Sequence, residues 1–64
     1  MKVGDLVEYV EDRSVGIVLR RVSDSDGIHI RGEDISKLWW VQFVDNQNPH
    51  WCSENEMYTL QKGK

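Results

Sequence analysis

The 64 residues of the chain suffice for one small domain, which we place at residues 1–64 with a polar tail at 61–64. The net charge of −3 disfavours binding to nucleic acid by bulk charge attraction. No stretch approaches the ~20 apolar residues of a membrane span, and the acidic start of the chain excludes a signal peptide. The single cysteine, Cys52, excludes an internal disulfide and fits a reducing, intracellular setting. The opening methionine suggests a whole short protein.

Two strands are expected in the first third of the chain. Val3, Val7 and Tyr9 alternate in part with charged residues, which predicts a first strand from Val3 to Val10. After a polar connection at residues 11–14, Gly16 opens a second strand at residues 17–22, with Val18 as its expected core residue.

The segment from Ser23 to Ser36 is rich in Gly, Asp and Ser, a composition that favours turns. Its short alternating piece at residues 28–30 is typical of an extended hairpin tip. We therefore expect an expanded loop at 23–36, and a loop of this length in a small domain is either functional or disordered.

The stretch from Lys37 to Asp45 predicts the central strand, because it alternates with period two and is rich in aromatic and β-branched residues. Trp39, Val41 and Phe43 share one face, which we assign to the core. Trp40 lies on the other face. It either packs against a loop or a neighbouring strand, or faces solvent as a contact residue.

The remaining residues predict a turn at 45–49, a very short strand at 50–52 and a last strand from Met57 to Leu60. Between these strands, Ser53 and Glu56 have the spacing of a capping box, which favours a single helical turn before the last strand. Five short strands separated by turns predict an all-β fold, either a small barrel or a pair of packed sheets, and closure of the sheet would remove its edges.

The order of the segments G-D-L-V-E-Y, G-I-V-L and W-V-Q-F-V-D, followed by a Trp and a one-turn helix, resembles SH3-like small barrels of the Tudor and KOW type. More closely, it is similar to short uncharacterised proteins of tailed bacteriophages that open with Gly-Asp-Leu-Val. The resemblance implies a five-stranded SH3-like barrel. It also implies a phage accessory or virion component, located in the host cell cytoplasm or in the virion.

Tudor domains bind methylated Lys or Arg in an aromatic cage, and the resemblance places Phe43 at one cage wall. Tyr9 or Trp40 would supply others. Asn46 stands where the related pattern has an aromatic residue, so the cage would lack a wall.

We expect a non-enzymatic module that mediates protein–protein interaction, with a protein partner or self-association. Arg20, Arg21, Trp40 and the loop at 23–36 are the expected contacts, and Tyr9 and Trp51 complete the set of candidate binding residues. The alternative is a nucleic-acid-binding module, in which Arg20, Arg21 and Arg31 contact the backbone and Trp40 stacks on a base. Binding to nucleic acid should weaken steeply with added salt, which would distinguish this alternative from protein binding.

His50 and Cys52 are two residues apart and share a strand face, but neither a metal site nor catalysis follows from this pair. A tetrahedral metal site needs further ligands at a usual spacing, and a nucleophile needs a base and an oxyanion hole. We therefore expect no catalytic residue, metal or cofactor, with Cys52 buried and His50 on the surface. The acidic residues at 5–12 are either a charged binding patch or a solubilising surface.

Overall fold

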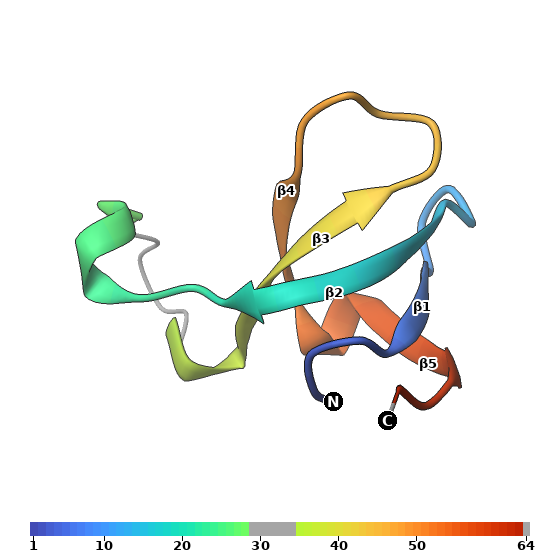
Figure 1. Ribbon diagram of the computed structural model, residues 1–64, viewed down its shortest axis with the longest axis horizontal. Helices are drawn as coiled ribbons and strands as arrows, with labels where there is room; N and C mark the ends of the chain where they lie inside the picture. The colour runs from blue at the N-terminus through green and yellow to red at the C-terminus, as the bar shows by residue number, and fades with distance from the viewer. Residues whose placement is uncertain (29–34, 64) are drawn as a thin grey trace.

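The computed structural model describes residues 1–28 and 35–63, and within them the chain is all-β with three isolated 3-10 turns (Figure 1). The prediction of an all-β fold with five strands is confirmed. The strands are β1 (Leu6–Tyr9), β2 (Val15–Arg21), β3 (Leu38–Phe43), β4 (His50–Ser53) and β5 (Met57–Gln61), and the turns are η1 (Asp24–Asp26), η2 (Ile35–Lys37) and η3 (Glu54–Glu56). No described helical segment is long or apolar enough to cross a membrane.

All the strand pairs are antiparallel, and they form one sheet in the order β4-β3-β2-β1-β5. The sheet is not closed into a barrel, so this part of the fold prediction is wrong. Closure would require β4 to pair with β5, but among the described strands β4 pairs only with β3 and β5 only with β1. Strands β4 and β5 therefore remain the two edges of the described sheet.

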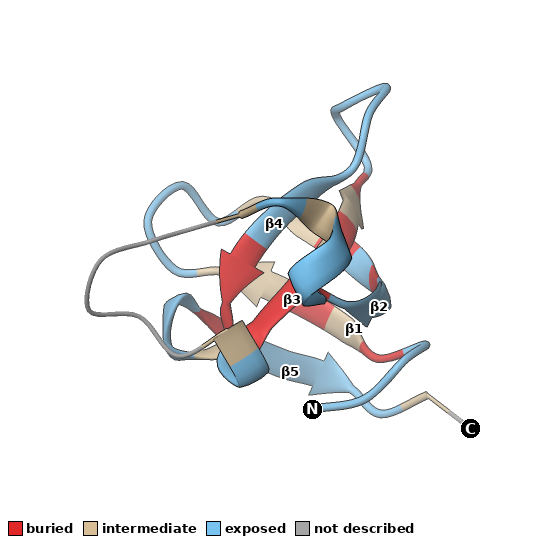
Figure 2. Cartoon of the chain, turned by 90° about the vertical axis from the view of Figure 1, so that its left-hand side faces the viewer, coloured by how far each residue is buried: buried red, intermediate tan, exposed pale blue. Residues whose placement is uncertain are grey.

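The core lies on one face of the sheet, where the inward residues of β3 meet those of its neighbours (Figure 2). Trp39, Val41 and Phe43 are all buried, which confirms the assignment of that face to the core. Val18 lies opposite Val41 and is also buried, as predicted. The cluster is completed by Val7, Cys52 and Met57.

Gly16 is placed where the backbone of β2 comes closest to β3. A Cβ atom at this position would lie 2.7 Å from Val41 Cγ1, 2.8 Å from the Gln42 carbonyl oxygen and 3.0 Å from Phe43 Cδ1. Glycine is therefore needed for the close approach of the two strands. Strand β2 itself begins at Val15, one residue before Gly16.

The N-terminal end of the predicted first strand is wrong, because β1 begins at Leu6 and Val3 is 55% exposed. The carboxylate of Asp5 accepts hydrogen bonds from the backbone N–H groups of Lys2 (2.9 Å) and Gly63 (2.8 Å). Asp5 is buried, and these bonds fold the preceding residues into a turn, in which Gly4 has a positive φ of 92°. The start of the chain is thereby tied to its end.

The helical turn before the last strand is confirmed as η3. Ser53 Oγ accepts the backbone N–H of Asn55, and the Glu56 carboxylate accepts the backbone N–H of Ser53, so the predicted capping box is present. Strand β5 extends through Gln61, which the sequence placed in the polar tail.

The two ends of the predicted loop at 23–36 form η1 and η2. Residues 29–34, including the candidate binding residue Arg31 and most of the predicted hairpin tip, lie outside the described residues.

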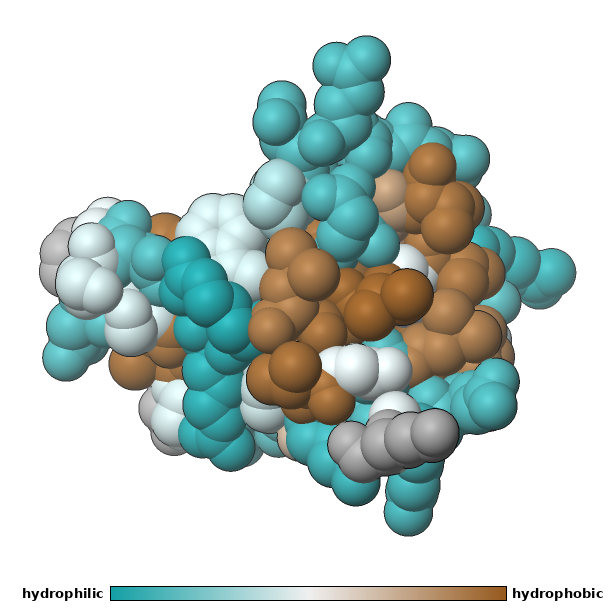
Figure 3. Space-filling model, in the orientation of Figure 1, coloured by the Kyte–Doolittle hydropathy of each residue, from teal (hydrophilic) through white to brown (hydrophobic). Residues whose placement is uncertain are grey.

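The outer face of the sheet carries apolar side chains, which gather over β2 and toward β1 and β5 in Figure 3. Ile17 and Leu19 on β2 are 48% and 43% exposed, and Tyr58 and Leu60 on β5 are 48% and 47% exposed. The small core therefore leaves a sizeable part of the apolar surface uncovered.

Candidate functional site

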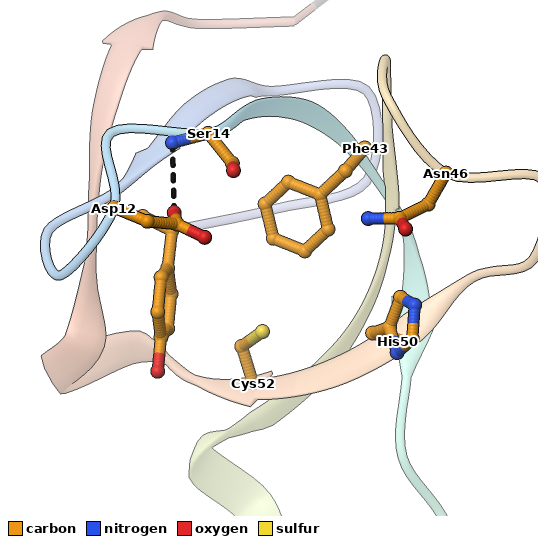
Figure 4. Close-up of a pocket in the computed structure, with 7 residues that line it drawn as sticks. Asp12, Ser14, Phe43, Asn46, His50 and Cys52 are labelled. Carbon is orange, nitrogen blue, oxygen red and sulfur yellow. Dashed lines mark hydrogen bonds between the residues drawn. The ribbon is translucent and has the colours of Figure 1, made fainter.

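A pocket of about 290 Å³ opens at the end of the sheet where β1 and β3 finish and β4 begins (Figure 4). Antiparallel order brings these three points together, because β1 and β3 run in one direction and β4 in the other. Asp12 and Ser14 line one side, Asn46 and His50 line the opposite side, and Phe43 projects between them. The full lining consists of Tyr9, Asp12, Ser14, Phe43, Asn46, His50 and Cys52.

Three rings lie next to one another at this pocket. The Tyr9 and Phe43 rings are edge to face, with centroids 6.2 Å apart and planes at 77°. The centroid of the His50 ring is 6.5 Å from that of Phe43. Tyr9 is half-buried and His50 is exposed, so two of the three rings remain accessible to a ligand.

The phenol of Tyr9 connects the pocket to two acidic side chains. Its single hydroxyl proton is shared between the carboxylates of Glu56, at 3.0 Å, and Glu11, at 3.2 Å. The bond to Glu56, with burial and the negative charges nearby, raises the pKa of Tyr9 well above its usual value. A second hollow, of about 260 Å³, shares Tyr9 with the first pocket and includes Glu11 and Glu56 in its lining.

Asp12 supplies a carboxylate to the pocket itself. Its Oδ1 atom accepts the backbone N–H of Ser14 at 2.9 Å, which closes the β1–β2 connection. Bonding to Ser14 lowers the pKa of Asp12, so the group is negatively charged at neutral pH. Together with Glu11 and Glu56, it gives the surroundings of the three rings a negative charge.

Cys52 lies on the floor of the pocket and is 8% exposed, as its assignment to the core predicted. Burial, reinforced by the negative charges of Glu56 and Asp12, raises the pKa of Cys52 to about 11. The thiol is therefore protonated at neutral pH and is a poor nucleophile. Among residues 1–28 and 35–63, no three His, Cys, Asp and Glu side chains come together in an arrangement that would hold a metal ion.

The candidate residues Arg20, Trp40 and Trp51 come together on the outer face, away from the pocket. Trp40 lies opposite Trp51 across β3 and β4; Trp40 is half-buried and Trp51 is 39% exposed. The Arg20 guanidinium lies over the Trp40 ring, 5.5 Å from its centroid. These contacts favour the neighbouring-strand packing considered for Trp40.

Asp26, which the sequence did not single out, organises this cluster. Its carboxylate accepts two hydrogen bonds from Arg20, at 2.9 and 3.0 Å, and one from the Trp40 indole nitrogen at 3.1 Å. It also accepts the backbone N–H of Ser23 at 2.8 Å. The bonds from Arg20, Ser23 and Trp40 hold the pKa of Asp26 far below its usual value. The spacing Ser23-x-x-Asp26 is a capping signal that could have identified this residue.

Arg21 belongs to a different cluster, around the buried Trp39. Its guanidinium lies 4.8 Å from the centroid of the Trp39 ring and donates to the Ser36 carbonyl oxygen at 3.4 Å. The Trp39 indole nitrogen donates to Glu54 at 3.1 Å. The candidate binding residues thus fall into separate regions: Tyr9 at the pocket, Arg20 with Trp40 and Trp51, and Arg21 beside Trp39.

The fold and the pocket define a small all-β protein with accessible aromatic rings beside carboxylates. No protein-family model, no curated protein and no solved structure matches the chain significantly. The resemblance to SH3-like barrels and to phage proteins therefore stays a prediction.

Proposed function

We propose that this protein is a non-enzymatic module that binds a partner protein by holding one of its cationic side chains in the pocket. The observation that carries the proposal is that the Tyr9 and His50 rings line the same pocket as the ionised Asp12 carboxylate. A cation there would lie among aromatic side chains and a negative charge. Cation–π attraction contributes about 0.5–1 kcal/mol at exposed sites and about 2 kcal/mol when the cation is desolvated.

The size and the charge of the pocket both suit such a ligand. A volume of about 290 Å³ is at the lower end of the range for small-molecule sites, and accommodates one long side chain. Glu11 and Glu56 extend the negative charge to the second hollow, where positive residues flanking the bound side chain would lie. Lysine, methylated lysine and arginine are the ligands that fit this chemistry.

The nucleic-acid alternative has less support. The Arg20 guanidinium already pairs with Asp26, so its charge is offset before any phosphate arrives. The net charge of −3 also opposes an approaching polyanion.

We also propose the likeness to SH3-like domains of the Tudor type. Its support is the order of the sequence segments and the helical turn η3 that precedes the last strand. A role as a phage accessory or virion component rests on the sequence resemblance alone.

The test is a titration of the protein with three short peptides, followed by backbone amide chemical shifts. The peptides carry lysine, trimethyllysine or acetyl-lysine at the same central position. We expect the two cationic peptides to shift the amides of Ser14, Asn46 and His50 in a saturable way. The neutral acetyl-lysine peptide should leave these amides unchanged.

Two matched variants assign the effect to the pocket. Asp12→Asn keeps an acceptor for the Ser14 N–H and removes the charge, so we expect it to weaken binding about tenfold. Asp24→Asn makes the same chemical change in η1 and should bind like the wild type. Equal binding of all three peptides, or equal loss in both variants, would contradict the proposal.

A further inference from the structure

His50 lines the pocket without being held by another polar side chain. It is the first residue of β4, it is exposed, and in Figure 4 it lies across the pocket from Asp12. Among the described residues its ring forms no hydrogen bond or ion pair, and its contact is with the Phe43 ring, at 6.5 Å between centroids. The imidazole can therefore take up and release a proton without breaking a bond inside the protein.

The other titratable side chains of the lining keep one protonation state from about pH 5 to pH 8. Hydrogen bonding to Ser14 lowers the pKa of Asp12, so this group stays a carboxylate. A hydrogen bond to a glutamate carboxylate raises the pKa of Tyr9 well above its usual value, and burial raises the pKa of Cys52 to about 11, so both stay neutral. Because histidine ordinarily changes its charge in this range, His50 is the group of the described lining that responds to mild acid.

The charged neighbours of this pocket lie outside its lining. Glu11 and Glu56 line the second hollow, and Asp45, in the connection between β3 and β4, is exposed. Arg13, in the connection between β1 and β2, acts through its charge on Tyr58 of β5. None of these four charged residues is a histidine, so they form a constant background to the charge of the lining in this range.

We propose that His50 makes the pocket release its cationic side chain in mild acid. Such release is a property of the same site and rests on the proposed function. A neutral imidazole puts no charge against a bound cation, whereas a protonated imidazole places a like charge in the same pocket. In a pocket of about 290 Å³ the two charges are close neighbours. Like charges a few ångströms apart at a solvent-accessible site change an equilibrium about fivefold.

Proton uptake and peptide binding are then linked in both directions. If protonation of His50 weakens binding of the peptide, the bound peptide must weaken binding of the proton by the same factor. The effect can therefore be measured on the ligand and, independently, on the histidine itself.

The first test is the affinity of the trimethyllysine peptide at pH 8 and at pH 5, with both peptide ends blocked and the ionic strength held constant. The trimethylammonium group keeps its charge at every pH, so a change in affinity comes from the protein. We expect binding to be about fivefold weaker at pH 5. The near-UV circular dichroism spectrum verifies that the protein stays folded at both pH values.

Two matched variants assign the pH dependence to one residue. His50→Gln keeps a polar side chain that takes up no proton, so we expect about the same affinity at pH 5 and pH 8. His29→Gln makes the same change at the other histidine of the chain and should keep the wild-type ratio of the two affinities.

The second test needs no variant. The ring protons of His50 are followed by NMR as the pH is lowered, with and without saturating trimethyllysine peptide. We expect the peptide to move the midpoint of this titration to lower pH, by the logarithm of the factor that separates the two affinities.

The outcomes distinguish acid release from the binding function on which it rests. Absence of saturable binding at both pH values would contradict the two proposals together. Equal binding at pH 5 and pH 8, or tighter binding at pH 5, would overturn acid release alone. A His50→Gln variant that keeps the wild-type pH dependence would also overturn it, because another group would then sense the pH.

Discussion

Arg20 and Asp26 form a two-pronged ion pair, in which two guanidinium nitrogens lie 3.0 and 2.9 Å from the two carboxylate oxygens. The pair connects the end of β2 to η1 and shares its carboxylate with the Trp40 indole. An arginine that the sequence offered as a contact residue thus has a partner within its own chain. The cluster holds the start of the loop against the sheet.

The first prediction concerns Asp26. Asp26→Ala removes the acceptor of Arg20, Trp40 and Ser23 together, so we expect the melting temperature to fall by a few degrees at neutral pH. The near-UV circular dichroism of the tryptophans should weaken at the same time. A thermal unfolding curve measures the melting temperature, and the near-UV circular dichroism spectrum of the folded protein measures the tryptophan signal.

This effect should depend on pH in a defined direction. The pKa of Asp26 is lower in the folded chain than its unfolded value of about 3.9, so its contribution is complete above that value. As the pH falls further, toward the folded pKa, the contribution is lost. The difference in melting temperature between the wild type and Asp26→Ala should therefore be constant from pH 6 to 8 and shrink below about pH 4. A difference that grew in acid would contradict this explanation.

Gly16 should tolerate no side chain. Gly16→Ala places a methyl group against Val41 and the Gln42 carbonyl group, and we expect a loss of about 1–3 kcal/mol of unfolding free energy. Urea denaturation measures the change.

Gly27 provides the matched control, because a Cβ atom there meets nothing within 4 Å although φ is 71°. Gly27→Ala should cost about 1 kcal/mol through backbone strain alone, and Gly27→Asn should cost less because Asn tolerates this conformation. A Gly16→Ala variant as stable as the wild type would show that β2 and β3 can separate without loss.

Asp5 should control how firmly the end of the chain is held. Asp5→Ala removes the acceptor of the Gly63 N–H, so hydrogen exchange at that amide should become faster and the melting temperature should fall. Asp5→Asn keeps one acceptor oxygen, so its exchange rate at Gly63 and its melting temperature should lie between those of the wild type and Asp5→Ala. If exchange at Gly63 is already fast in the wild type, the tie between the two ends is not formed in solution.

Cys52 should react slowly with thiol reagents in the folded protein. With a pKa of about 11 it is almost entirely protonated at pH 8, and its side chain is buried. We expect reaction with an aromatic disulfide reagent to be at least tenfold slower in buffer than in guanidinium chloride. Because the folded pKa is raised, folding also loses stability as the pH rises from about 9 toward 11. Equal rates in the two solvents would place the thiol at the surface.

The strands could be predicted because local patterns determine them. The alternation at Trp39, Val41 and Phe43 identified the buried face, and Ser53 with Glu56 identified the turn before β5. The start of β1 could not be predicted, because it depends on a hydrogen bond from Gly63 to Asp5 across 58 positions in the sequence. The open sheet likewise depends on where β5 lands after η3, which no local pattern encodes.

The pocket was predicted only in part, for a similar reason. The resemblance to Tudor domains placed Phe43 at one wall of a cage and offered Tyr9 or Trp40 for others; Tyr9 and Phe43 line the pocket, and Trp40 does not. Asp12 and His50 join them only through the ends of three strands that meet in space. Asp26 was missed because its partners, Arg20 and Trp40, lie on two different strands.

The contact between Gly4 and Gly63 has a consequence for the topology of the domain. A Cβ atom on Gly63 would lie 2.5 Å from the Gly4 carbonyl carbon, so the backbone three residues from the start of the chain touches the backbone at the end of the described residues. A short peptide could join the two ends into a ring without distorting any strand. The domain is therefore suited to circular permutation, and to insertion as a unit into an exposed loop of a host protein.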